Sequence, residues 1–190
     1  MSELFSIQLQ NRQQQGRDGV WLDLPTTTEQ VQAALRQIGI SSDNPQGLFI
    51  SGYFAEEEKR FAIPYNMVLA SNVDELNFLA SRLETLSTGE RAELNAALQA
   101  PQSELFSIGR ITDFPENVDY YVHLPDVHGP AQLGDYYLNR SGMVDMPEEW
   151  KGGIDTAQFG RYVAQQEQGA FTQYGYCLLY TSPSPRDRQK

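Results

Sequence analysis

The hydrophobic period of the chain changes twice, and these changes constrain its fold more than any other feature. Apolar residues alternate with polar ones over Phe5–Leu9 and again over Val20–Leu24, which is typical of half-buried strands. Leu48–Tyr53 predicts a further strand. Between the second and third strands we expect a helix, because Thr26 can cap it and Glu29 can reach back to that cap. The first third is therefore predicted to be a β-β-α-β unit.

From Ser71 the apolar residues follow a helical period. They form one face of a predicted helix, made of Leu76, Leu79, Ala80, Leu83 and Leu86. A second capping box, Ser87 with Glu90, predicts another helix, and Pro101 should end it. The centre of the chain is therefore expected to be helical.

One six-residue string occurs twice. Ser-Glu-Leu-Phe-Ser-Ile stands at residues 2–7, where the alternation predicts a strand, and at residues 103–108, where the surroundings favour a helix. The flanking sequences share nothing, so we interpret the repeat as accidental and not as a duplicated domain.

Beyond Pro115 strand and helix patterns mix again. We expect a strand over Tyr120–Leu124, a helix near Leu133–Arg140, a helix that begins at Asp155 or Thr156, and a closing strand over Phe171–Tyr176. The predicted fold class is α+β, elongated, with three small domains. Their predicted ranges are an N-terminal α+β domain over 1–62, a central helical domain over 63–114 and a C-terminal α+β domain over 115–176.

The last 14 residues, 177–190, have a different character. The string from Cys177 to Asp187 resembles the translation of a transposase-based sequencing-library adapter, so we interpret 177–190 as a non-native tail without a function. The alternative is a natural basic tail rich in proline and serine. Cys177 is the single cysteine of the chain. On this interpretation the natural protein up to Tyr176 has no thiol chemistry.

The net charge restricts the partners. The full chain has a net charge of −11, and residues 1–176 contain 11 basic and 24 acidic side chains, a net charge of −13. Such a chain is repelled by nucleic acid and by anionic lipid, and it suits basic partners such as the grooves of DNA-binding proteins. With no apolar run of bilayer length and no signal pattern, a cytoplasmic location is expected.

Few residues could support catalysis. His123, Asp126 and His128 could together hold a metal for a hydrolase, but their spacing matches no common ligand pattern. Phosphate-binding loops and nucleophile motifs of the G-x-S-x-G type are absent from the sequence. We therefore predict that the protein is not an enzyme and that it uses no cofactor and no metal.

Acidic residues are the remaining feature. Those from the centre onward are Asp74, Glu75, Glu84, Glu90, Glu93, Asp113, Glu116, Asp119, Asp126, Asp135, Asp145, Glu148, Glu149 and Asp155. Charge alone fits a solvated surface as well as a binding surface. Aromatic residues are frequent in the same part of the chain, and core packing or a subunit interface explains them better than base stacking, since the surrounding acids repel phosphate.

Several strings in order resemble the ArdA family of antirestriction proteins, which occur on plasmids, transposons and phages. The resemblance extends from about Phe5 to Tyr176 and depends on Trp21–Pro25, Asp74–Ala80, Leu133–Tyr137, Ile154–Asp155, Phe159–Arg161, Glu167–Thr172 and Gly175–Tyr176.

The resemblance implies an elongated, three-domain protein that dimerises through its C-terminal part. It also implies that carboxylates imitate the phosphates of B-form DNA and occupy the DNA-binding groove of type I restriction-modification enzymes. The 14 acids above are then the candidate partner-binding residues. The alternative is a mobile-element interaction module that binds another host protein through its tyrosine-rich C-terminal region, where Tyr136 and Tyr137 would be essential.

Overall fold

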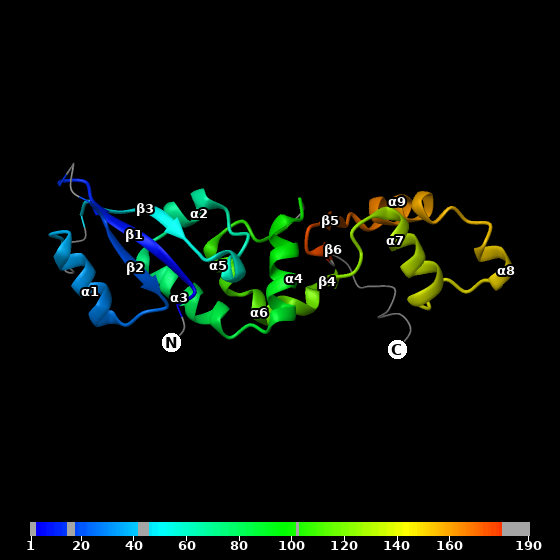
Figure 1. Ribbon diagram of the computed structural model, residues 1–190, viewed down its shortest axis with the longest axis horizontal. Coiled ribbons are helices and arrows are strands. Elements are labelled where there is room, and N and C mark those ends of the chain that lie inside the picture. Colours follow the sequence, from blue (N-terminus) through cyan, green and yellow to red (C-terminus); the bar gives the residue numbers. More distant parts are fainter. Residues whose placement is uncertain (1–2, 15–17, 42–45, 102, 180–190) are drawn as a thin grey trace. The chain divides into compact units, whose positions relative to one another are not determined.

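The computed structural model describes residues 3–14, 18–41, 46–101 and 103–179. Two compact units make up the chain: unit 1 contains Met1–Ser87 and Leu105–Pro115, and unit 2 contains Thr88–Glu104 and Glu116–Lys190. Each contains helices and an antiparallel sheet, which confirms the α+β class (Figure 1). The division into three domains, with boundaries after residues 62 and 114, stays a prediction.

Unit 1 is built on a sheet with the strand order β2-β1-β3, in which β1 (Phe5–Asn11) is central (Figure 1). Both neighbours, β2 (Val20–Leu24) and β3 (Leu48–Phe54), run antiparallel to β1. The register with β3 shifts between Gln8 and Leu9, as in a β-bulge. All three predicted strands are therefore confirmed.

The helix α1 (Thr28–Gln37) begins one residue later than the sequence suggests. Its N-cap is Thr27, whose side chain accepts from the Gln30 amide, while the Gln30 side chain bonds back to the cap. The predicted cap, Thr26 with Glu29, is wrong because Thr26 is buried and its amide donates to Asn77 Oδ1 at 2.7 Å. Gly39 follows the helix with a φ of +71°, which favours glycine there.

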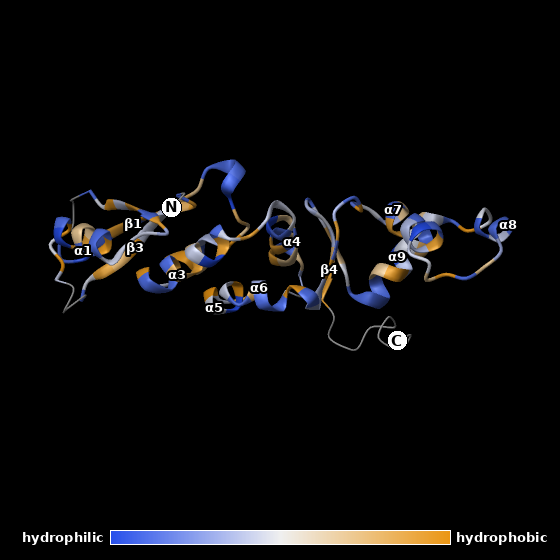
Figure 2. Cartoon of the chain, turned by 90° about the horizontal axis from the view of Figure 1, so that it is seen from below, coloured by the Kyte–Doolittle hydropathy of each residue, from blue (hydrophilic) through white to orange (hydrophobic). Residues whose placement is uncertain are grey.

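The other elements of unit 1 are short except for one helix. They are η1 (Glu57–Lys59), α2 (Tyr65–Leu69), α3 (Val73–Glu84) and α5 (Ile108–Thr112). The predicted stripe on α3 is confirmed, since Leu76, Leu79 and Leu83 are fully buried. Figure 2 shows both hydrophobic and hydrophilic residues along this helix. Asn72 caps α3 by accepting from the Glu75 amide at 2.8 Å.

The chain first enters unit 2 at Thr88, returns to unit 1 at Leu105, and passes into unit 2 again within α6 (Phe114–Asn117), which η2 (Val118–Tyr120) follows. The sheet of unit 2 has the order β4-β6-β5, made of β4 (Tyr121–Leu124), β5 (Ala170–Thr172) and β6 (Gly175–Leu179). The helix α4 (Thr88–Gln99), predicted from its capping box and from Pro101, contacts β4 and β6.

The predicted closing strand is wrong in one respect, because Phe171–Tyr176 is not one strand. It is part of a hairpin in which β5 pairs with β6, and Gly175 has a φ of +115° beside the turn. The strand β6 continues to Leu179, and Cys177 and Leu178 in it are buried. The first residues of the segment interpreted as a tail therefore occupy sheet positions, and residues 180–190 lie outside the described residues.

Two helices of unit 2 approach each other through glycines. The helix α7 (Pro130–Asp135) continues as the π-helix η3 (Tyr136–Arg140) and packs on α9 (Thr156–Glu167). A Cβ atom on Gly134 would lie 1.9 Å from the Thr156 carbonyl oxygen, and one on Gly160 would lie 1.8 Å from the Pro130 carbonyl oxygen. The core beside them contains Leu133, Tyr137 and Tyr176. The remaining helix, α8 (Glu148–Lys151), has no buried residue.

Within the part of the chain that the structure describes, no helix is both long and apolar enough to cross a bilayer.

Candidate partner-binding surface

The 14 candidate acids lie on both units. Asp74, Glu75, Glu84 and Asp113 belong to unit 1, and the other ten belong to unit 2. Nine of the 14 are exposed, namely Asp74, Asp113, Glu116, Asp119, Asp126, Asp145, Glu148, Glu149 and Asp155. The other five, Glu75, Glu84, Glu90, Glu93 and Asp135, are partly buried.

Some candidate acids in unit 2 already have structural roles. Asp135 Oδ2 lies 3.1 Å from the Arg140 guanidinium, and Glu148 Oε1 lies 2.6 Å from Lys151 Nζ. Asp155 caps α9 by accepting from the Gln158 amide at 2.9 Å. These three carboxylates are less suited to bind a partner than unpaired carboxylates are, because a cation or a helix terminus already offsets their charge.

Glu93 differs from the other candidates in its protonation. Burial, reinforced by the negative charges of Glu90 and Asp119, raises the pKa of Glu93 to about 7. Near neutral pH a large fraction of this side chain is therefore protonated. Glu93 is the weakest of the candidate mimic charges.

Five exposed candidates form no ion pair among the described residues. They are Asp74 on α3, Asp119 on η2, Asp126 before α7, Asp145, and Glu149 on α8. All of them except Asp74 belong to unit 2.

Several exposed acids in unit 1 are not among the 14 candidates. Glu3, Asp18, Asp23, Glu29 and the run Glu56–Glu58 are all exposed. Hydrogen bonds from the Glu29 backbone and from Thr27 lower the pKa of Glu29, which keeps that carboxylate ionised. The hydrophilic run Glu56–Arg60 directly after a predicted strand could have indicated the exposed turn at Glu56–Glu58.

The histidine group does not form a metal site. Among the residues that the structure describes, no group of three or more His, Cys, Asp or Glu side chains could hold a metal ion. His123 Nε2 lies 2.7 Å from the Tyr174 carbonyl oxygen, to which it must donate. This nitrogen is therefore not free to coordinate a metal.

The tyrosine pair of the alternative hypothesis is mostly internal. Tyr137 is buried and its hydroxyl donates to Glu167 Oε1 at 2.5 Å, and Tyr176 donates to Glu167 Oε2 at 3.2 Å. Burial and the adjacent Glu167 carboxylate raise the pKa of Tyr176. Tyr136 is partly buried and lies under the Arg140 guanidinium. Replacing Tyr137 would therefore change the core as well as any binding surface.

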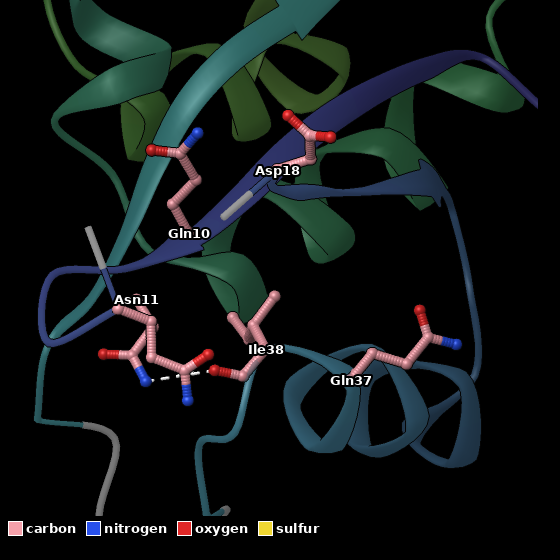
Figure 3. A pocket seen from close by; sticks show the side chains of 6 residues that line it. Gln10, Asn11, Asp18, Gln37 and Ile38 are labelled. Carbon is pink, nitrogen blue, oxygen red and sulfur yellow. Dashed lines mark hydrogen bonds between the residues drawn. The ribbon is translucent and has the colours of Figure 1, made fainter. Parts of the chain in front are cut away.

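A small hollow in unit 1 is lined by side-chain amides. Gln10, Asn11, Gln14, Asp18, Gln37 and Ile38 surround it, and Asn11 Nδ2 donates to the Ile38 carbonyl at 3.0 Å (Figure 3). This bond ties β1 to the end of α1. The hollow is too small for an organic substrate, and its lining contains no nucleophile paired with a base.

These features define a small, acidic α+β protein whose exposed charge suits basic partners. A family model described as antirestriction protein (ArdA) matches residues 15–178, so the chain belongs to the ArdA antirestriction family, and its function is antirestriction. The resemblance seen in the sequence is confirmed. No curated protein sequence matches the chain.

Proposed function

We propose that the protein occupies the DNA-binding groove of type I restriction-modification enzymes, with surface carboxylates in place of the phosphates of B-form DNA. It would act by binding in the cytoplasm, without catalysis. The observation that supports this most is the excess of exposed acid, nine of the 14 candidates together with the run Glu56–Glu58, in a chain with a net charge of −11. A groove that attracts phosphate attracts such a surface by the same long-range field.

The number of carboxylates also sets the length of duplex DNA that one chain can imitate. Duplex DNA carries one negative charge per roughly 1.7 Å of axis, so about a dozen carboxylates on one face replace on the order of 20 Å of duplex. A long bipartite DNA site needs more than this. We therefore propose that the protein acts as a homodimer through the C-terminal part of unit 2, where Met143 and Tyr162 are exposed apolar residues available for an interface.

A competition experiment tests the proposal. The full chain is titrated against labelled duplex DNA bound to a purified type I methyltransferase core, at low and at high salt. We expect displacement of the DNA that weakens as salt rises, because both partners are charged over a broad surface. Displacement of equal strength at both salt concentrations would contradict the electrostatic basis, and no displacement at low salt would contradict the proposed target.

A further inference from the structure

The sheet of unit 1 has one face that is open to solvent. In β2 the side chains of Leu22 and Leu24 are buried, while Trp21 and Asp23, which alternate with them, are exposed. On β3 the side chain of Phe54 is 55% exposed, and Trp21 is 49% exposed. The sheet therefore buries the face that carries Leu22 and Leu24 and leaves the large side chains of Trp21 and Phe54 on the other.

The strand register places these side chains in two rows. Asp23 pairs with Ser6, which pairs with Phe54 on the other side of β1. Trp21 pairs with Gln8, which pairs with Gly52. Since residues two apart on a strand point to the same face, Trp21 and Asp23 lie side by side at about 7 Å.

The indole of Trp21 crosses the sheet. A Cβ on Gly52 would lie 3.0 Å from Trp21 Cη2 and 3.1 Å from Gln8 Cβ. Trp21 therefore reaches from β2 over the central strand to β3, and the glycine gives it room to do so. The result is an aromatic surface lying across the sheet and half open to solvent.

Carboxylates border this surface. Ser6 Oγ lies 2.8 Å from Asp23 Oδ1 and 3.3 Å from Glu3 Oε1, and both carboxylates are exposed. The nearby Lys59 is bound to Glu56 at 2.9 Å, and Arg12 lies over the Phe49 ring at the other end of β3. These cations are engaged, so the border keeps a negative charge beside the indole.

We propose that this face, made of Trp21, Asp23, Ser6 and Phe54, binds an arginine side chain of a protein partner. The guanidinium group stacks on the indole of Trp21 while its edge donates to the Asp23 carboxylate. A guanidinium is planar, stacks on aromatic rings and bonds carboxylates in two places, whereas an ammonium group does neither as well. A nucleobase could also stack on the indole, but the acids that border it repel the attached phosphates. This inference rests on the proposed function only for the identity of the partner that carries the arginine.

Fluorine NMR of the full chain labelled with 5-fluorotryptophan tests the contact directly. The chain has two tryptophans, Trp21 and Trp150, and a Trp150→Phe sample assigns their signals. The probes are a short blocked Gly-Arg-Gly-Arg-Gly peptide and its lysine counterpart, with the Trp150 signal reporting general attraction to the acidic surface. We expect a saturable shift of the Trp21 signal with both peptides. The dissociation constant should be about two- to fivefold lower for the arginine peptide than for the lysine peptide.

Asp23→Asn is the principal variant, because an amide oxygen keeps the Ser6 hydrogen bond and removes only the charge. We expect it to weaken arginine-peptide binding about two- to fivefold. Asp74→Asn, which removes one exposed charge from α3 of the same unit, serves as its control and should change binding little. Equal responses to both peptides, or equal effects of the two variants, would overturn the proposal. A shift of the Trp21 signal with protein concentration alone, or with a thymidine oligonucleotide, would overturn it as well.

The DNA competition experiment separates this inference from the proposed function. If the wild type displaces DNA and Trp21→Leu and Asp23→Asn displace it equally well, the arginine contact is wrong and the proposed function stands. If the arginine peptide binds at Trp21 but no DNA is displaced, the contact stands and the proposed target is wrong.

Discussion

Unit 1 and unit 2 both contain a three-stranded antiparallel sheet, but they use their acidic side chains differently. In unit 1, Asp74 and the run Glu56–Glu58 are exposed at helix starts, and of these acids Glu56 is paired with Lys59. In unit 2, Glu167 bonds two buried tyrosines and Asp155 caps α9. An acid count therefore describes the available charge of unit 1 better than that of unit 2.

The difference follows from how each unit fills its core. In unit 1 the helix α3 contacts β2, and its leucines Leu76 and Leu79 are fully buried. The core of unit 2 includes Tyr137 and Tyr176, whose hydroxyls need partners when they are buried, and Glu167 supplies them. Acidity in unit 2 is thus partly a requirement of its own packing.

The largest effect should come from the glycine contact between α7 and α9 in unit 2. We expect Gly160→Ala to lower the free energy of unfolding of unit 2 by about 1–3 kcal/mol, because the added methyl group meets the Pro130 carbonyl and the backbone must shift. Denaturation followed by the fluorescence of Trp150, with Trp21 as the reporter of unit 1, measures this loss.

Gly89→Ala is the matched control in unit 2. A Cβ on Gly89 meets nothing within 4 Å, and the residue lies in the first turn of α4. We expect no loss, and a gain of up to about 1 kcal/mol from helix propensity. Equal denaturation midpoints for Gly160→Ala and the wild type would contradict the close helix contact.

A smaller effect is expected from the tyrosine–glutamate contact. Tyr137→Phe removes the hydroxyl that donates to Glu167 and leaves a partly buried carboxylate with one donor fewer. We expect a loss of about 1–2 kcal/mol, measured by urea denaturation at pH 7. Tyr162→Phe, at a position that is 59% exposed, should be neutral, and a similar loss in both variants would show that Glu167 is not held by Tyr137.

The smallest effect concerns the pH dependence of unit 2. Because the pKa of Glu93 is raised from 4.5 to about 7, the folded state keeps a proton that the unfolded state has lost between these pH values. The stability of unit 2 therefore falls as pH rises through this window. Glu93→Gln should reduce this loss of stability by about 1 kcal/mol. The figure allows for screening by solvent, because the side chain is only partly buried.

Thermal unfolding at pH 5 and pH 7.5 measures this change. The exposed Glu149→Gln is the control and should leave the pH dependence as it is in the wild type. A Glu93→Gln variant that loses stability with pH as the wild type does would show that another group titrates in this window.

The repeated string shows what the sequence could and could not predict. Leu4 and Phe5 are 3% and 2% exposed, and both lie against β2, where Phe5 pairs with Leu24 and the Leu4 amide donates to the Leu24 carbonyl. In the second copy, Leu105 is buried but Phe106 is 68% exposed, and Ser107 caps α5. Alternation over several residues predicted the strand correctly, whereas the same six residues without strand neighbours became a helix start.

Other differences have similar causes. The cap of α1 moved from Thr26 to Thr27 because Asn77, 51 residues away, bonds to Thr26. The final hairpin was missed because Thr172 and Gly175 close it with a side-chain bond that periodicity does not show. For the acids, sequence gives position and charge, but the engagement of Asp135 and Glu148 depends on cations that only the fold brings near.

The most direct test of the central claim compares two triple variants in the DNA competition experiment. Asp126→Asn, Asp145→Asn and Glu149→Gln together remove three exposed charges of unit 2, while Asp126→Glu, Asp145→Glu and Glu149→Asp keep them. If carboxylates act as phosphate substitutes, the amide triple should displace DNA about tenfold less well at low salt, since each exposed charge contributes about 0.5 kcal/mol. The acid-for-acid triple should act like the wild type. Equal displacement of DNA by both triple variants would contradict the proposal that these carboxylates take the place of phosphates.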